Sequence, residues 1–101
     1  MIQRFRELHT SGCFVMPNPW DRGSAQIMEQ LGFKALATSS SAHARSLGKS
    51  DQELTRDELL THVADLTGFI GVPLNVDSER LYPNEPGGIE RTVELLASAG
   101  A

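Results

Sequence analysis

The feature that most constrains this chain is an order of short apolar run, polar loop and amphipathic segment that occurs three times in 101 residues. The apolar runs have the character of strands buried in a parallel sheet, and they lie at residues 14–17, 34–38 and 74–77. The amphipathic segments have helical spacing, and they lie at residues 22–31, 55–70 and 88–99. This alternation predicts an α/β fold with three parallel strands side by side, in the order of the chain.

Local signals mark where the helices begin and end. Asp21 can cap the first of them, and Gly32 stands where a left-handed residue closes a helix. The run from Thr55 to Glu58 has the pattern of a capping box. A short amphipathic helix is also predicted at residues 2–9, ahead of the first strand.

Composition narrows the class of protein. The formal charge is −4 and Lys and Arg form no cluster, which argues against a nucleic-acid binder. No apolar run approaches the roughly 20 residues that span a bilayer, so no membrane association is expected. The single Cys13 cannot form an internal disulfide, and a cytoplasmic setting is the default. These properties predict one soluble globular unit over residues 1–101.

The candidate functional residues follow the strands, because functional groups of α/β folds gather at the carboxyl ends of strands. Asp77 and Glu79, two residues apart, could hold a hard cation such as Mg²⁺, and a solvated acidic loop is the alternative. The tract Thr38–Ser41 could hold a carboxylate or phosphate, and a local hydroxyl turn is the alternative. Asp51 is a further candidate acid, or else a turn residue or cap.

Other chemistries lack the residues that they need. His9, His43 and His62 share no ligand spacing, so they are predicted to be structural or solvent-facing. No His and Asp partnership accompanies the serine tract, which argues against a serine nucleophile. Cys13 is predicted to be a buried or spare thiol rather than a nucleophile, and no glycine-rich phosphate loop is present.

Several segments, taken in order, resemble one family. They are Phe14–Asp21, Ser24-Ala25, Leu31–Ser40, Arg56–Glu58 and Pro73–Glu79. Their order and spacing resemble the isocitrate lyase and phosphoenolpyruvate mutase superfamily over nearly the whole chain. The ordered combination carries the likeness, rather than any single motif.

The resemblance implies a (β/α)₈ barrel of the TIM type, of which residues 1–101 would form the first three strand–helix units as one partial domain. A full barrel needs about 250 residues, so the chain would be an amino-terminal portion that stops before the fourth strand. The implied activity is that of a Mg²⁺-dependent lyase or mutase. Its substrates would be 2-oxo or 2-hydroxy acids that react through a pyruvate-like enolate, whose charge the metal stabilises.

The resemblance also assigns roles by position. Asp77 and Glu79 match the acids that hold Mg²⁺, and Asp51 matches an acid that supports the metal's water shell. Asp51 and Ser39 are the candidate catalytic residues. The candidate substrate-binding residues come from the loops after the second and third strands, and they are Ser39, Ser40, Ser41 and Tyr82.

Three positions depart from the family's pattern. Glu79 stands where the second acid is usually Asp, Ser40 stands where Gly is common, and Leu81-Tyr82-Pro83 replaces a Gly-Tyr-Gly. These departures leave open which acid is the substrate, and whether the parent is a lyase, a mutase or a decarboxylase.

The length of the chain sets the remaining expectations. The full-length parent is expected to be an enzyme that binds a small carboxylic acid and forms a homo-oligomer. Residues 1–101 alone are expected to be inactive, and a short sheet with open edges is expected to be marginal and prone to associate. The alternative is a non-catalytic α/β fragment or a small interaction module.

Overall fold

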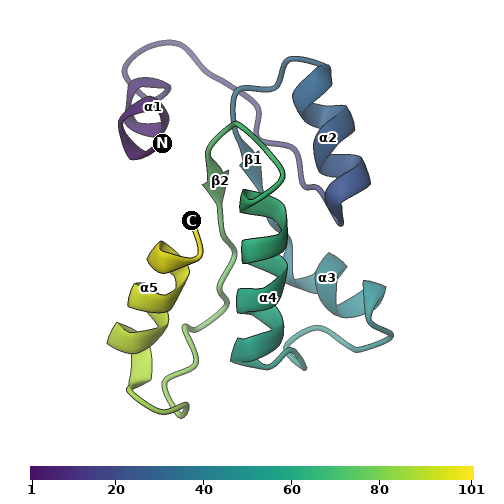
Figure 1. Cartoon of the computed structure of the whole chain (residues 1–101), viewed down its shortest axis with the longest axis vertical. Coiled ribbons are helices and arrows are strands. Elements are labelled where there is room, and N and C mark those ends of the chain that lie inside the picture. Colours follow the sequence, from purple (N-terminus) through teal and green to yellow (C-terminus); the bar gives the residue numbers. More distant parts are fainter.

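The computed structural model describes all residues 1–101 and consists of helices around a small sheet (Figure 1). The helices are α1 (Ile2–Glu7), α2 (Arg22–Gln30), α3 (Ser40–Ser46), α4 (Arg56–Thr67) and α5 (Gly88–Ser98). The strands are β1 (Leu36–Ala37) and β2 (Leu74–Asn75). The four predicted helices form, each somewhat shorter than its amphipathic pattern. None of the helices has both the length and the apolar composition that crossing a membrane requires.

The two strands pair in parallel, with Leu36 opposite Leu74 and Ala37 opposite Asn75. Each lies inside its predicted apolar run, but each is only two residues long. Both strands point toward the end of the molecule where α3 begins (Figure 1). The residues that follow β1 and β2 therefore lie at the same end of the sheet.

The first predicted strand, at residues 14–17, does not form. The segment still lies beside β1, because the Ala37 N–H donates to the Pro17 carbonyl at 3.0 Å. The Asn18 side-chain amide also donates to the Ala37 carbonyl, at 2.8 Å. Pro17 and Pro19 have no N–H to donate, so a regular ladder cannot continue here. The predicted three-stranded sheet is thus one regular pair with an irregular extended neighbour.

A further difference from the prediction is α3, which lies within the connection that the sequence marks as polar loop. Ser39 caps this helix, since its Oγ accepts the Ala42 N–H at 3.3 Å. Ala42 and Ala44 favour the helix once it has started. Serine in a short tract favours turns and caps equally, which is why the sequence pattern gave no helix here.

The predicted caps of the other helices are confirmed. The Asp21 carboxylate accepts the Ser24 N–H at 2.8 Å at the start of α2. Thr55 and Glu58 form the capping box of α4, with hydrogen bonds of 3.1 Å and 3.0 Å between each side chain and the other's N–H. The helix ends at Thr67 rather than at residue 70, because glycine follows it at position 68.

The core lies between the sheet and α4, which contacts both α2 and α5 (Figure 1). Leu59, Val63 and Leu66 repeat at helical spacing on α4, and each is almost fully buried. The buried cluster is completed by Ala25, Leu36, Ile70, Val72, Leu74, Tyr82 and Leu96.

Arg56, the first residue of α4, is a buried cation, with 8% of its surface exposed. Its guanidinium donates to the Pro86 carbonyl at 2.9 Å and to Thr92 Oγ1 at 3.4 Å. No carboxylate forms an ion pair with it. These hydrogen bonds join the start of α4 to the turn that leads into α5.

Replacing this cation is expected to weaken the fold. Arg56→Ala leaves the Pro86 carbonyl without its donor and should lower the free energy of unfolding by about 2 kcal/mol. Arg91→Ala is the matched control, because Arg91 is exposed and pairs only with Glu94, and it should cost less than about 0.5 kcal/mol. Urea denaturation followed by circular dichroism measures both. Equal losses for the two variants would contradict the anchoring role of Arg56.

Candidate functional site

The polar residues that follow β1 and β2 meet at one end of the sheet. The Asp77 carboxylate accepts two hydrogen bonds from Ser40, from its hydroxyl at 2.7 Å and from its N–H at 3.1 Å. The Asp77 N–H donates to Thr38 Oγ1 at 2.8 Å. The two loops, 37 to 39 residues apart in sequence, are therefore joined by direct contacts, as expected for parallel strands that end on the same side.

These contacts keep Asp77 ionised. Partial burial raises the pKa of the Asp77 carboxyl, but hydrogen bonds from the Ser40 hydroxyl, the Ser40 N–H and the Glu79 N–H together lower it below its ordinary value. Asp77 is consequently an anion at neutral pH, and its side chain remains partly open to solvent. It is a negative charge fixed by donors on one side and accessible on the other.

The serines of the tract that follows β1 have different hydrogen-bond partners. Ser39 uses its hydroxyl oxygen to cap α3, and Ser40 gives both its N–H and its hydroxyl to Asp77. Ser41, in the first turn of α3, is half-buried and makes no side-chain hydrogen bond. The predicted roles of Ser39, Ser40 and Ser41 in binding a carboxylate stay predictions, and of the three only Ser40 contacts Asp77.

Glu79 belongs to the same loop, and Tyr82 holds it. The Tyr82 hydroxyl donates to Glu79 Oε2 at 3.0 Å, and the ring is buried in the core. Burial, followed by this contact with the carboxylate, raises the pKa of Tyr82, so the phenol stays protonated and remains a donor. The other oxygen of Glu79, Oε1, is buried and has no hydrogen-bond partner. The contact that the structure shows for the Tyr82 hydroxyl is with Glu79, and its predicted contact with substrate stays a prediction.

Asp51 does not join this cluster. It lies in an exposed turn, and its side chain makes no hydrogen bond. The neighbouring residue is the one that reaches the site's loop, because Arg80 donates to Gln52 Oε1 at 3.1 Å. Sequence reasoning did not identify this link, and no spacing or composition signal would have found it. The role of Asp51 in a metal's water shell stays a prediction.

The donor set at this end of the sheet suits a hard cation. Asp77 and Glu79 offer carboxylate oxygens, and the unpaired Glu79 Oε1 is a buried polar atom that a cation or its water would satisfy. No group of three His, Cys, Asp or Glu side chains is arranged to hold a metal ion. The two carboxylates would therefore need oxygen atoms from water or substrate to complete a Mg²⁺ shell.

Two histidines form a second polar cluster that the sequence did not reveal. His43 of α3 and His62 of α4 stack with ring centroids 3.8 Å apart, and they are 7% and 8% exposed. Burial lowers the pKa of both, and that of His62 falls to about 4, with the charge of His43 as the next cause. His43 Nδ1 and His62 Nε2 have no hydrogen-bond partners. The prediction of a structural role agrees with their burial, whereas His9 is exposed.

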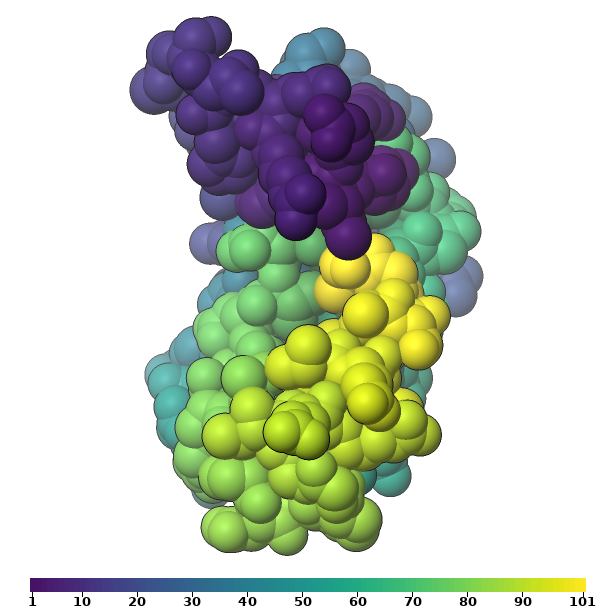
Figure 2. Space-filling model, turned by 90° about the vertical axis from the view of Figure 1, so that its left-hand side faces the viewer, coloured from purple at the N-terminus to yellow at the C-terminus, as the bar shows by residue number.

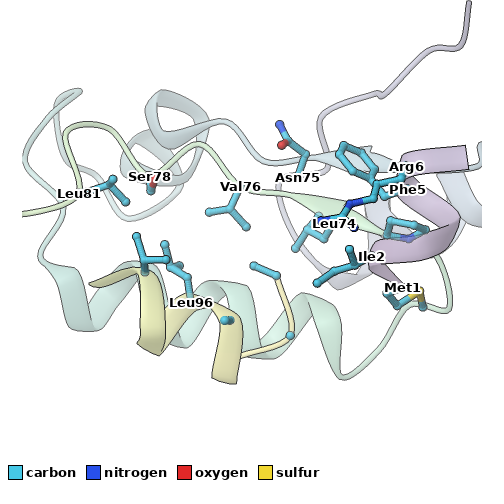
Figure 3. A pocket seen from close by; sticks show the side chains of 15 residues that line it. Met1, Ile2, Phe5, Arg6, Leu74, Asn75, Val76, Ser78, Leu81 and Leu96 are labelled. Atoms are coloured by element: carbon cyan, nitrogen blue, oxygen red, sulfur yellow. The ribbon is translucent and has the colours of Figure 1, made fainter. Parts of the chain in front are cut away.

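An apolar groove runs along the unpaired side of β2, between α1 and α5. Ile2, Phe5, Leu74, Val76 and Leu96 contribute to its lining (Figure 3). On this face of the molecule α1 lies directly above the C-terminal end of α5 (Figure 2). Neither acid of the candidate site lines the groove. Arg6 is the one charged side chain of its lining, which is otherwise mostly apolar and holds no carboxylate side chain for a metal.

Comparisons with known proteins point to the same family as the motifs. A family model described as phosphoenolpyruvate phosphomutase matches residues 5–101. A 2-methylisocitrate lyase from Aeropyrum pernix is 35% identical over 88 residues, which cover 86% of this chain and 28% of the relative. An oxaloacetate decarboxylase from Paraburkholderia xenovorans is 38% identical over 102 residues, which cover 98% of this chain and 34% of the relative.

Comparison with solved structures leads to the same family. A protein from Burkholderia cenocepacia J2315, described as a candidate lyase/mutase, is 44% identical and superposes with a TM-score of 0.92. The match covers 98% of this chain and 36% of that protein, so the chain spans about a third of the length of the relatives that it matches. The ordered motifs, the family model and the superposition agree, and the chain belongs to the phosphoenolpyruvate phosphomutase family.

Proposed function

We propose that this chain is the metal- and carboxylate-binding opening segment of a lyase or mutase that acts on 2-oxo or 2-hydroxy acids. The observation that carries the proposal is the contact between Asp77 and Ser40, which joins the loops after β1 and β2 into one polar site. The relatives' names support the class of reaction, since they are a methylisocitrate lyase and an oxaloacetate decarboxylase. In the longer protein the segment would supply the first units of a (β/α)₈ barrel.

In this proposal Asp77 and Glu79 hold Mg²⁺, and Asp51 supports its water shell. When bound, the cation would neutralise the charge that develops on the enolate oxygen. The chain's own residues prepare the site for it. Ser40 holds the Asp77 carboxylate in its charged form and in one orientation, and the backbone bond from Glu79 N–H to Asp77 Oδ1, at 3.1 Å, ties the two acids together.

The substrate would bind next to these acids through its own carboxylate. Ser39 and Ser41 flank in sequence the residue that contacts Asp77, and their hydroxyls would donate to the substrate carboxylate. With oxaloacetate as substrate, the bond between C3 and the C4 carboxylate would break, CO₂ would leave, and the electron pair of that bond would remain as the enolate of pyruvate, which a proton from solvent would convert to pyruvate. We propose that the whole protein works in this way as a homo-oligomer in the cytoplasm, with no nucleic-acid or membrane partner.

A non-catalytic role for the 101 residues on their own is the second candidate. It is favoured by the lack of a third metal-binding side chain near Asp77 and Glu79 and by the span of about a third of the relatives. Both observations predict that this segment is inactive by itself, and they leave the proposed role in a longer protein intact.

A chimera tests the proposal. Residues 1–101 are put in place of the matching third of the Paraburkholderia xenovorans oxaloacetate decarboxylase, with which they share 38% identity. The chimera should release pyruvate from oxaloacetate in a coupled assay with Mg²⁺, and EDTA should stop it, whereas residues 1–101 alone should show no turnover. A chimera that is folded by circular dichroism but inactive with Mg²⁺, or full activity from the 101 residues, would contradict the proposal.

A further inference from the structure

The one tyrosine of the chain is placed to control how Glu79 presents its carboxylate. The ring of Tyr82 is 8% exposed and belongs to the buried core cluster, so its position is fixed by packing rather than by solvent-exposed contacts. Its hydroxyl donates to Glu79 Oε2 at 3.0 Å. A hydroxyl that donates to a carboxylate makes one of the stronger hydrogen bonds available to a protein.

The backbone between the two residues is bent to make this contact. Glu79, Leu81 and Tyr82 have positive φ angles of 54°, 64° and 51°, in the left-handed region that residues other than glycine rarely adopt. This turn carries the Tyr82 ring back to a carboxylate three residues earlier. Such backbone is held only when surrounding contacts over-determine it, and the buried ring with its hydrogen bond provides those contacts.

The bond leaves Glu79 with one oxygen for a ligand. Oε2 is occupied by the Tyr82 hydroxyl, and Oε1 is buried without a partner. We propose that Tyr82 is a positioning residue that fixes Glu79 to offer a divalent cation, or its bound water, the single oxygen Oε1. This inference rests on the proposed function, because it requires Asp77 and Glu79 to be the cation's ligands. It gives Tyr82 a role through Glu79, not through contact with substrate.

Binding of Mn²⁺ by the 101-residue chain, followed by the loss of the free-ion signal in electron paramagnetic resonance, tests the inference without any activity. Tyr82→Phe keeps the ring in the core and removes the hydroxyl, and it should weaken Mn²⁺ binding by about 10-fold, as expected when a ligand loses its supporting hydrogen bond. In the background of Glu79→Gln, the Tyr82→Phe change should have no further effect, because the two residues act as one unit.

Thr92→Val is the matched control, since Thr92 is fully buried and its hydroxyl donates to the Gly88 carbonyl away from the site. It should lower stability to urea and leave Mn²⁺ affinity within about twofold. Provided that wild type binds Mn²⁺, two results would overturn the positioning role. One is an unchanged Mn²⁺ affinity in Tyr82→Phe. The other is a loss of affinity from Tyr82→Phe that is the same in the wild-type and Glu79→Gln backgrounds. If wild type and Asp77→Asn bind Mn²⁺ equally, the proposed function fails instead, and the inference fails with it.

Discussion

Acidification from pH 6.5 to pH 5 should lower the free energy of unfolding of this chain by about 2 kcal/mol, through His62 alone. Burial, and then the neighbouring His43, lower the pKa of His62 to about 4 in the folded chain, against an ordinary value of 6.5. Between these two values the unfolded chain binds a proton that the folded chain excludes. The stabilisation is therefore fully present above pH 6.5 and is lost as the pH falls toward 4.

Several charged groups surround the histidine stack. Asp57, Glu58 and Asp65 lie with the two rings around one shallow groove, and Lys49 and Arg22 pair with Glu58 and Asp65. The pKa of Glu58 is lowered to about 2, by its hydrogen bond from Lys49 first, and that of Asp21, which also faces His62, is lowered mainly by the Ser24 N–H. Because the pKa values of Glu58 and Asp21 are lowered in the folded chain, the stability that they contribute is lost mostly at lower pH than that of His62.

Urea denaturation at a series of pH values measures this effect. His62→Phe retains an aromatic ring against His43 and should flatten the dependence between pH 6.5 and pH 5. His9→Gln, at an exposed position, should leave it as in wild type. A slope as steep in His62→Phe as in wild type would show that His62 is not its origin.

Loss of the Asp77 carboxylate should abolish turnover in the chimera described above. Asp77→Ala removes a ligand charge and both hydrogen bonds to Ser40, and turnover should fall by at least about 100-fold, as for the removal of one group that stabilises charge in a transition state. Asp77→Asn retains an acceptor for Ser40 and should be nearly as inactive, because the missing element is the charge.

A matched acid separates this effect from a general loss of charge. Asp57 is exposed in the first turn of α4 and its carboxylate makes no hydrogen bond, and Asp57→Asn should keep at least half of the wild-type rate. Circular dichroism confirms that each variant is folded. An Asp77→Asn chimera that turns over at the wild-type rate would rule out the proposed metal role of Asp77.

The parts of the fold that the sequence predicts are those whose stabilising residues are close together in the chain. Helices α2, α4 and α5 were predictable because their apolar spacing and their caps, such as Asp21 and Thr55, are local in the chain. The strand at 14–17 was wrongly predicted because an apolar run was weighed above Pro17, which has no N–H for the ladder. The helix α3 was missed because part of what holds its first turn, Asp77, comes from 37 residues away.

The candidate site divides in the same way. That Asp77 and the serine tract would reach one end of the sheet followed from parallel strands, and the Ser40 contact agrees with it. The positions of single side chains did not follow. Tyr82 turns back to Glu79 through a left-handed backbone, which the residue types of Leu81-Tyr82-Pro83 do not predict. Asp51 is exposed, and its neighbour Gln52 accepts the hydrogen bond from Arg80.

The measurement that tests the account most directly is a map of where Mn²⁺ binds on the 101-residue chain. Amide signals in ¹H–¹⁵N spectra broaden when they lie near the bound paramagnetic ion, and weak binding is sufficient because the ion exchanges rapidly. If Asp77 and Glu79 hold the cation, the amides of Ser40, Asp77 and Glu79 should broaden first, and Asp77→Asn should remove the effect. Broadening centred on the acidic groove around Asp57 and Asp65, with Asp77 and Glu79 unaffected, would contradict it.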